Sequence, residues 1–286
     1  MIPNEVQHTL HDALEFEGVG LHSGVVGHVS VQPQPADSGL SFRLGAGAPV
    51  LAAVAENVVE TRRATVLGDG RRTVSTVEHL LSALFGMGVD NALIEVEGPE
   101  IPAMDGSAAE FVRAIESVGL ASQAGARVRF IAERPYFKRD GEALIVILPA
   151  AEFRVKFSVD YPAPIGSQYF DGAIDATLYR DDIAPARTFG YLQEYQALLE
   201  RGLARGGTLG NALVFTEEGP LTKLRWPNEV VRHKVLDLIG DIALLGAWPQ
   251  CEIVAVKTGH RLHAAAVCEL RAALGPRLGA RAGAPA

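Results

Sequence analysis

The chain has 286 residues, of which 48% are hydrophobic and 21% charged. That is the composition of a globular protein with ample material for a core, and the length allows one large domain or two ordinary ones. With 26 Lys and Arg against 34 Asp and Glu, the net charge is −8, which argues against a general nucleic-acid binder. The two cysteines, Cys251 and Cys268, are too few for a disulfide framework or a four-cysteine zinc site. A bound metal would therefore be held by histidine and carboxylate.

The sequence carries no sign of a membrane span or of a secretory signal. No stretch approaches the 18 or more consecutive apolar residues that a transmembrane helix needs. The start of the chain, MIPNEVQHTLHDALEF, lacks a basic region followed by an apolar run. We therefore expect a cytoplasmic protein.

The first half of the chain indicates strands followed by helices, with one strand between the helices. Alternating apolar and polar residues interrupted by glycines, and a run of β-branched residues, predict the early strands. Apolar residues at helical spacing predict the helices. The expected strands cover residues 16–30, 39–44, 50–61 and 92–97, and the expected helices cover 76–85 and 108–119. The small, polar segment ASQAGAR at residues 121–127 is expected to be a linker.

The second half repeats this order. Its expected strands cover residues 127–132, 143–148, 153–159 and 252–257, and its helical segments cover 190–202, 229–245 and 262–274. Because strands precede helices in each half, we predict an α+β fold rather than a doubly wound sheet. We expect two similar domains, residues 1–122 and 127–274, each a β-sheet covered by two helices, with the helix layers packed between the sheets. The Gly/Ala/Pro/Arg-rich tail at 275–286 is expected to be disordered.

A weak internal repeat connects the two halves. VEHLLSAL at residues 77–84 aligns with VRHKVLDL at 231–238, and each is followed by an apolar strand. The alignment gives His79 and His233, which are 154 residues apart, equivalent positions on equivalent helices. A pseudo-twofold arrangement of the halves would bring these two helices face to face.

His233 and Asp237 share one face of their predicted helix, because residues four apart are neighbours on a helix. An imidazole and a carboxylate at this spacing can reach one metal ion, and Asp241 continues the same face. The alternative is an ordinary His–Asp pair on a helix surface, which the spacing alone favours.

Glu78 and His79 begin the equivalent helix in the first half. Ser75 and Glu78 also fit a capping box, which is a purely structural role. If the repeat brings His79 opposite His233, however, two histidines and Asp237 form a three-ligand set. Catalytic zinc sites typically have three protein ligands and leave the fourth position open. Glu78 would then lie close enough to take a proton from a metal-activated water.

The other histidines have weaker patterns. His260 follows a predicted strand and a glycine, where loops often present functional groups, and a protonated imidazole there would suit an acid or a cationic stabiliser. His263, three residues later, is consistent with simple placement on the last helix. His22 lies among Gly18, Gly20 and Gly24, which suggests a turn or close approach of a ligand. The remaining three, expected at the surface, are His8, His11 and His28.

Taken together, several long motifs resemble one family, UDP-3-O-acyl-N-acetylglucosamine deacetylase, the zinc enzyme of lipid A synthesis in Gram-negative bacteria. The resemblance extends from GVGLHSG near the N-terminus to about residue 270. Its most specific segments are STVEHLLSAL, DNALIEVEGPEIPAMDGSAAEFV, ARTFG, GGTLGNALV, VRHKVLDLIGD and the TGH that ends at His260.

The resemblance implies a role for each matching residue. His79, His233 and Asp237 would be the zinc ligands, with Fe²⁺ as an alternative metal because histidine and carboxylate suit both. Glu78 would be the general base, His260 a cationic catalytic histidine, Asp241 the carboxylate that orients it, and Thr188 the donor to the oxyanion. Substrate contacts would come from Lys234, from His22, and from an insert at about 190–215 that surrounds the acyl chain, with Phe189, Tyr191, Leu192, Leu203 and Val214 in or beside it.

The implied reaction is hydrolysis of the acetamide of UDP-3-O-acyl-N-acetylglucosamine, the committed step of lipid A synthesis, by a monomer. Gly210 and Asn228 depart from the family pattern, where acidic residues are common, and this bears on acyl length and local geometry near the insert. Two alternatives are a zinc amidase for a different acylated amino sugar and a metal-free acyl-sugar binding module. The presence of Glu78 beside the presumed ligands disfavours the binding module.

Overall fold

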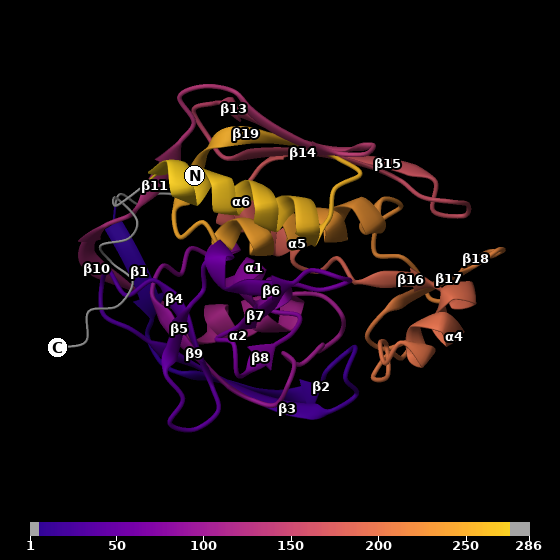
Figure 1. The fold of residues 1–286 in the computed structure, drawn as a ribbon, viewed down its shortest axis with the longest axis horizontal. Helices are drawn as coiled ribbons and strands as arrows, with labels where there is room; N and C mark the ends of the chain where they lie inside the picture. Colours follow the sequence, from indigo (N-terminus) through magenta and orange to yellow (C-terminus); the bar gives the residue numbers. More distant parts are fainter. Residues whose placement is uncertain (1–5, 275–286) are drawn as a thin grey trace.

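The computed structural model describes residues 6–274, and its elements form four layers. Figure 1 shows a sheet at one side, two layers of helices in the middle and a second sheet at the other side. This arrangement confirms the predicted α+β class, with helices packed between two sheets. Within the described residues, no helix is long and apolar enough to cross a membrane.

The first sheet has five strands in the order β2-β3-β9-β4-β5. The central strand β9 is antiparallel to β3 and parallel to β4. Alternate residues of β3 are buried, so one sheet face packs against helices α1 and α2 while the other faces solvent. The elements are β2 (Leu14–Val19), β3 (Val26–Pro33), β4 (Leu40–Leu44), β5 (Val50–Ala52), β9 (Ala92–Glu97), α1 (Glu78–Gly86) and α2 (Ala109–Val118).

The second sheet repeats this topology. Its order is β12-β13-β19-β14-β15, and its central strand β19 is antiparallel to β13 and parallel to β14. A further strand, β11, pairs with β19. The elements are β11 (Arg129–Ile131), β12 (Tyr136–Asp140), β13 (Ala143–Pro149), β14 (Arg154–Asp160), β15 (Ser167–Ala173), β19 (Trp248–Val256), α5 (Glu229–Ala243) and α6 (His260–Leu274). The shared strand order supports the internal repeat, in which β9 follows α1 as β19 follows α5.

Helices α1 and α5 pack against each other at the centre of the molecule (Figure 1). Every residue of α1 is buried, and in α5 only Arg232 is not. A helix enclosed on all sides has no solvent-facing polar face, so the polar and charged residues buried in α5, such as His233, Asp237 and Asp241, must find partners inside the protein. The predicted face-to-face contact of the two repeated helices is confirmed.

The remaining elements connect or extend the layers. A small unit of β16, α4, β17 and β18 projects from one end of them (Figure 1). The elements are β1 (Val6–Leu10), η1 (Ala55–Asn57), β6 (Val58–Glu60), β7 (Val66–Gly68), β8 (Thr73–Val74), β10 (Leu120–Ala126), α3 (Ala176–Leu178), η2 (Tyr179–Ile183), β16 (Phe189–Tyr191), α4 (Leu192–Glu200), β17 (Leu213–Thr216) and β18 (Gly219–Pro220).

Several local predictions differ from the structure, and His8, expected at the surface, is buried. The expected linker at 121–127 is largely strand β10, which pairs antiparallel with β1. Its small side chains are half-buried or exposed, so the strand lacks an apolar pattern. The expected strand at 50–61 is interrupted by the 3₁₀ turn η1. The helix expected at 190–202 begins only at Leu192, because strand β16 occupies residues 189–191. The predicted tail at 275–286 lies outside the described residues.

Candidate metal centre and active site

The first turn of α1 and the middle of α5 bring His79, His233 and Asp237 together. One ligand atom from each lies within 4.8 Å of the others. Asp237 Oδ1 is 3.7 Å from His79 Nε2 and 3.3 Å from His233 Nε2, and the two imidazole rings meet edge to face with centroids 5.0 Å apart. The i, i+4 pair on α5 and the repeated histidine on α1 therefore converge on one point.

The protonation states of these side chains suit a divalent cation. Burial lowers the pKa of His79 to about 3, and burial also lowers the pKa of His233, so both imidazoles are neutral. Burial opposes ionisation of Asp237, but the Lys234 ammonium and the His260 imidazolium hold the pKa of this carboxyl below its usual range. Neutral imidazoles and an ionised carboxylate are the forms that coordinate Zn²⁺ or Fe²⁺. The donor set thus fits a metal.

A contact with the backbone fixes the orientation of the His233 ring. Its Nδ1 lies 3.0 Å from the carbonyl oxygen of Ala186, to which an Nδ1–H would donate. This contact leaves the Nε2 lone pair directed toward Asp237 and His79. Metal-binding histidines commonly donate their second nitrogen to a carbonyl or carboxylate in this way.

Glu78 is buried beside this cluster but does not cap its helix. The N-cap of α1 is Val77, and the Glu78 carboxylate accepts a hydrogen bond from the backbone N–H of Thr65 at 3.0 Å. The capping-box interpretation with Ser75 is therefore wrong. Burial raises the pKa of Glu78 to about 8, although the nearby His260 opposes this shift. A carboxyl with a raised pKa can exchange a proton near neutral pH.

His260 lies across the site from Glu78, at the first residue of α6. Its Nε2 is 3.8 Å from Glu78 Oε1, and its Nδ1 is 2.8 Å from Asp241 Oδ2. Burial disfavours the imidazolium, but the Asp241 and Glu78 carboxylates raise the pKa of His260 to about 9. His260 is thus positioned as a cation whose Nε2 faces the cluster.

Asp241 is held by two further groups, Thr65, which the sequence analysis did not consider, and His263, to which it gave only a place on the last helix. The Thr65 hydroxyl donates to Asp241 Oδ1 at 2.6 Å, and His263 Nδ1 lies 2.8 Å from Asp241 Oδ2. His263 is fully buried, and its Nε2 is 2.7 Å from the Thr258 hydroxyl. The three-residue spacing of His260 and His263 on one helix was the available signal for this role. Thr65 lies in a connecting segment and had no signal of this kind.

A cavity of about 240 Å³ opens in front of the cluster. It brings together most of the residues expected to be catalytic, metal-binding or in contact with substrate. Those in its lining are His22, Glu78, His79, Thr188, Phe189, Tyr191, His233, Lys234, Asp237 and His260. Asp241 lies behind His260, whereas Leu192, Leu203 and Val214 belong to the projecting unit but not to this lining. Two lining residues that the sequence analysis did not identify, Arg63 and Glu194, form an ion pair.

The glycine-rich loop beside the cavity is held by Glu100. The Glu100 carboxylate accepts hydrogen bonds from the backbone N–H groups of His22 and Ser23 and from the Thr76 hydroxyl. A Cβ at Gly20 would lie 2.4 Å from Glu100 Oε2, so any larger residue at this position would displace the Glu100 carboxylate from the loop. The loop is thereby tied to the segment just before α1, which places His22 at the cavity.

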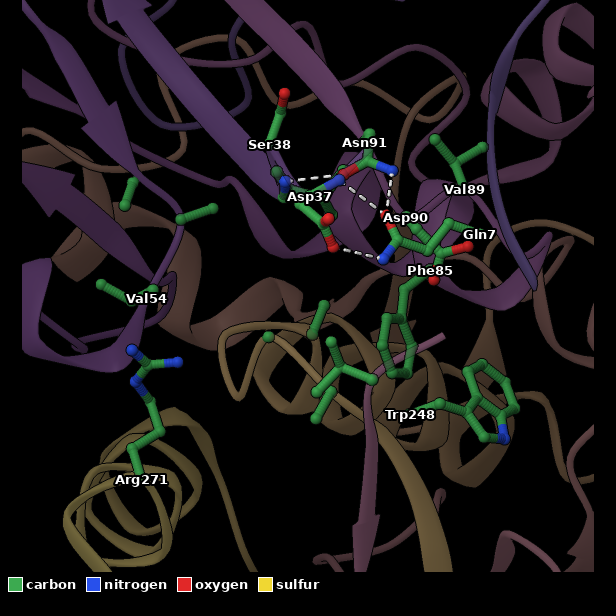
Figure 2. Close-up of a pocket in the computed structure, with 18 residues that line it drawn as sticks. Gln7, Asp37, Ser38, Val54, Phe85, Val89, Asp90, Asn91, Trp248 and Arg271 are labelled. Atoms are coloured by element: carbon green, nitrogen blue, oxygen red, sulfur yellow. Dashed lines mark hydrogen bonds between the residues drawn. The ribbon is translucent and has the colours of Figure 1, made fainter. Parts of the chain in front are cut away.

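A second cavity, of about 100 Å³, lies elsewhere between the two sheet-and-helix units (Figure 2). The Gln7 side chain donates to Asp37 and accepts from Asn91, and Phe85 stacks on Trp248 with ring centroids 4.8 Å apart. Among the described residues, the side-chain clusters that could hold a metal ion all come from α1, α5 and α6, and each includes at least one residue that lines the larger cavity. The larger cavity is therefore the candidate active site.

Comparisons with known proteins agree with this geometry. A family model described as "LpxC: UDP-3-O-acyl N-acetylglycosamine deacetylase" matches residues 7–272. The chain is 44% identical over 266 residues to the UDP-3-O-acyl-N-acetylglucosamine deacetylase of Nostoc sp. (strain PCC 7120), covering 90% of this chain and 95% of the relative. It is 41% identical over 269 residues to the protein of that name from Geotalea uraniireducens, covering 92% and 88%. For Myxococcus xanthus the identity is 42% over 262 residues, covering 90% and 83%.

Proposed function

This chain belongs to the UDP-3-O-acyl N-acetylglycosamine deacetylase family, and on that basis we propose that it hydrolyses the acetamide of UDP-3-O-acyl-N-acetylglucosamine. The products are UDP-3-O-acyl-glucosamine and acetate, and the reaction belongs to lipid A synthesis. The observation that carries the proposal is the convergence of His79, His233 and Asp237 on one point, with Glu78 beside them. The family membership makes the protein an enzyme of the hydrolase class.

His79, His233 and Asp237 would hold the metal, and we propose Zn²⁺, with Fe²⁺ as the alternative. When bound, such a cation polarises the acetamide carbonyl and lowers the pKa of an attacking water toward neutrality. Lys234 Nζ donates to Asp237 Oδ2 at 2.5 Å and so fixes one carboxylate oxygen while the other faces the histidines. Lys234 also lines the cavity, where we assign it a contact with the substrate.

Glu78 acts as the general base in this proposal. The Thr65 N–H holds one of its carboxylate oxygens, Oε2, and the other faces the cavity side of His260. A cation held by the neighbouring ligands would favour the ionised form of Glu78 by lowering the pKa of its carboxyl. In this form the carboxylate would take the proton from the attacking water as the tetrahedral species forms. General-base catalysis of this kind contributes roughly a hundredfold to ten-thousandfold to the rate.

His260 supplies positive charge and a proton. Asp241 keeps the His260 imidazolium in place through Nδ1, so that Nε2–H faces the reacting atoms. We propose that His260 or Glu78 protonates the 2-amino group as the C–N bond breaks. Thr188 is assigned as a donor to the oxyanion; its backbone is fixed by hydrogen bonds to Gly106 and Leu213. Preorganised donors of this kind stabilise the transition state because they need no reorganisation.

The projecting unit completes the substrate site. Phe189 and Tyr191 present aromatic surface to the cavity, and we propose that the insert at about 190–215 surrounds the acyl chain, with Leu192, Leu203 and Val214 beside it. We also propose domains of residues 1–122 and 127–274, a contact of His22 with the substrate, and, from the family resemblance, a cytoplasmic monomer.

Metal analysis combined with a deacetylation assay tests the proposal. Purified protein should hold about one tightly bound metal ion per chain and should release acetate from UDP-3-O-acyl-N-acetylglucosamine. Correctly folded protein with neither metal nor turnover would overturn it. Turnover of a different acylated amino sugar in a substrate panel would reassign the substrate, and tight binding without turnover would identify a binding module.

A further inference from the structure

The segment from Pro185 to Phe189 runs along the candidate metal centre. The Ala186 carbonyl oxygen lies 3.0 Å from His233 Nδ1, and the Phe189 and His233 rings meet edge to face with centroids 6.1 Å apart. Thr188, between these two residues, lines the active-site cavity. Most of the segment lies between η2 and β16, outside any helix or strand. Contacts with other parts of the fold must therefore fix the position of the Thr188 hydroxyl.

Glu229, the first residue of α5, holds this segment through a buried ion pair with Arg187. The Glu229 side chain is fully buried, and that of Arg187 is 12% exposed. Glu229 Oε1 accepts hydrogen bonds from Arg187 Nε at 2.9 Å and from the Arg187 backbone N–H at 3.2 Å, and Glu229 Oε2 accepts one from Arg187 Nη2 at 3.2 Å. A two-pronged pair of this kind fixes orientation as well as distance. Because α5 also carries His233 and Asp237, the pair ties the segment to the helix that bears two of the proposed metal ligands.

Arg225 extends this ion pair to a second carboxylate. Its backbone N–H donates to Glu229 Oε2 at 2.6 Å, and its guanidinium donates to Asp105 Oδ2 at 2.8 Å and to the carbonyl oxygen of Pro185. Arg225 thereby links the start of α5 both to Asp105 and to the residue that opens the segment. The Arg225 side chain is 35% exposed, so it is the more accessible of the two arginines.

Asp105 leads into a tight turn at Gly106 that contacts Thr188 directly. The Gly106 backbone has a φ of 82°, which favours glycine, and its carbonyl oxygen accepts a hydrogen bond from the Thr188 N–H at 2.7 Å. A Cβ at Gly106 would lie 2.0 Å from the carbonyl oxygen of Asn211 and 3.3 Å from Thr188 Cγ2. Both the backbone and the methyl group of Thr188 therefore rest on a turn whose first residue is held by Arg225.

We propose that Asp105, Arg187, Arg225 and Glu229 are positioning residues that fix the Thr188 hydroxyl for the reaction. This inference rests on the proposed function, because it takes Thr188 as the donor to the oxyanion. The four residues lie outside the cavity lining, so they act through Thr188 and not on the substrate. An oxyanion donor is effective only where it already stands at the place where the charge develops, and a displacement of about 1 Å can cost about a hundredfold in rate.

The test loosens the network at two points and measures kcat per bound metal ion. Glu229→Gln keeps the size of the side chain but leaves one acceptor oxygen in place of two, so one of its two arginine contacts is lost. We expect kcat to fall by about tenfold to a hundredfold while KM stays nearly constant. Arg225→Met removes only the contacts with Asp105 and Pro185 and should give a smaller fall in the same direction. Because Arg225 is more exposed, this variant provides the test if Glu229→Gln does not fold.

A double-mutant cycle with Thr188→Ala separates positioning from a general structural role. Thr188→Ala alone should lower kcat by about a hundredfold to a thousandfold, as loss of an oxyanion donor does. Adding Glu229→Gln or Arg225→Met to Thr188→Ala should lower kcat no further, because the hydroxyl that the network positions is gone. Substitutions that act independently of Thr188 would instead lower kcat by the same factor in both backgrounds. That additivity, or an unchanged kcat in Thr188→Ala, overturns the inference.

Asp90→Asn is the matched control. Asp90 accepts hydrogen bonds from the guanidinium of the buried Arg127 and lines the second cavity, so the substitution disturbs a comparable ion pair elsewhere in the fold. It should lower the denaturation midpoint and leave kcat per bound metal ion unchanged. A fall in kcat as large as that in Glu229→Gln would overturn the inference. Failure of the proposed function is distinguishable, because the unmodified, metal-loaded enzyme would then release no acetate from UDP-3-O-acyl-N-acetylglucosamine.

Discussion

Gly240 of α5 lies against the backbone of Glu78, so closely that a Cβ atom at position 240 would be 2.1 Å from the Glu78 carbonyl oxygen. The absence of a side chain at this position lets the first turn of α1 press directly on α5. Because Glu78 and His79 stand in that turn, and Asp237 and Asp241 flank Gly240 on α5, this contact sets the separation of the catalytic groups.

Gly240→Ala should damage both stability and activity. The added methyl group cannot be accommodated without moving α1 away from α5, and overpacking of this kind costs about 1–3 kcal/mol. We expect a lower denaturation midpoint, weaker metal retention and reduced kcat. Gly210→Ala is the control, because a Cβ there meets only Thr208 Oγ1 at an ordinary 3.4 Å. Equal stability of the two variants would contradict the close contact.

His79→Ala should remove the metal while leaving the fold in place. The substitution deletes one of three ligands, so metal content after dialysis should fall well below one ion per chain. Elemental analysis measures this, and circular dichroism checks the fold. His11→Ala serves for comparison, because His11 is exposed and distant from the cluster in the fold. Unchanged metal content in His79→Ala would remove this residue from the ligand set.

Glu78→Gln should separate metal binding from turnover. The amide has the size of the carboxyl group but cannot accept the proton of the attacking water. We expect metal content close to that of the unmodified protein and a loss of kcat of roughly a hundredfold to ten-thousandfold. Steady-state kinetics, measured on enzyme of known metal content, test this expected loss of kcat. A variant that kept most of its turnover would show that another group is the base.

His263→Phe should reduce kcat although His263 does not line the cavity. The variant keeps a ring of similar shape but loses the hydrogen bond to Asp241, so His260 is held less well. Losses of about tenfold to a hundredfold are typical when a supporting partner of this kind is removed. We expect KM to stay nearly constant, and His263→Asn, whose amide can donate to Asp241, to recover part of kcat. If KM and kcat change together with stability, the residue serves packing alone.

The two cysteines should differ sharply in reactivity. Cys251 is fully buried in β19, and burial raises the pKa of its thiol to about 12, whereas Cys268 is exposed on α6. Only the thiolate reacts with alkylating reagents, and a thiol with this pKa stays protonated up to pH 10. Iodoacetamide should therefore modify Cys268 alone in the native protein and both residues after denaturation. Mass spectrometry of the labelled peptides measures this, and native labelling of Cys251 would contradict its burial.

The convergence of His79, His233 and Asp237 could be predicted from sequence because its signals are local or repeated. His233 and Asp237 lie one helical turn apart, and the repeat placed His79 opposite them. The contacts of Thr65 and the Arg63–Glu194 pair could not be predicted in this way. They join connecting segments to elements that meet only in the folded chain, and no periodicity relates their positions. Strand β10 was not predicted for a different reason. Its small side chains bury little surface, so its sequence shows no alternation of apolar and polar residues.

If His79, His233 and Asp237 are the metal ligands, as we propose, their division between α1 and α5 makes metal capture depend on the docking of the two halves of the chain. A nascent chain that has folded only its first half holds His79 and Glu78 but neither His233 nor Asp237. One histidine alone binds a divalent cation weakly, so the cation enters only after both halves have docked. In that case the proposed hydrolysis requires the complete chain, and tight metal retention would report that the two halves are correctly joined.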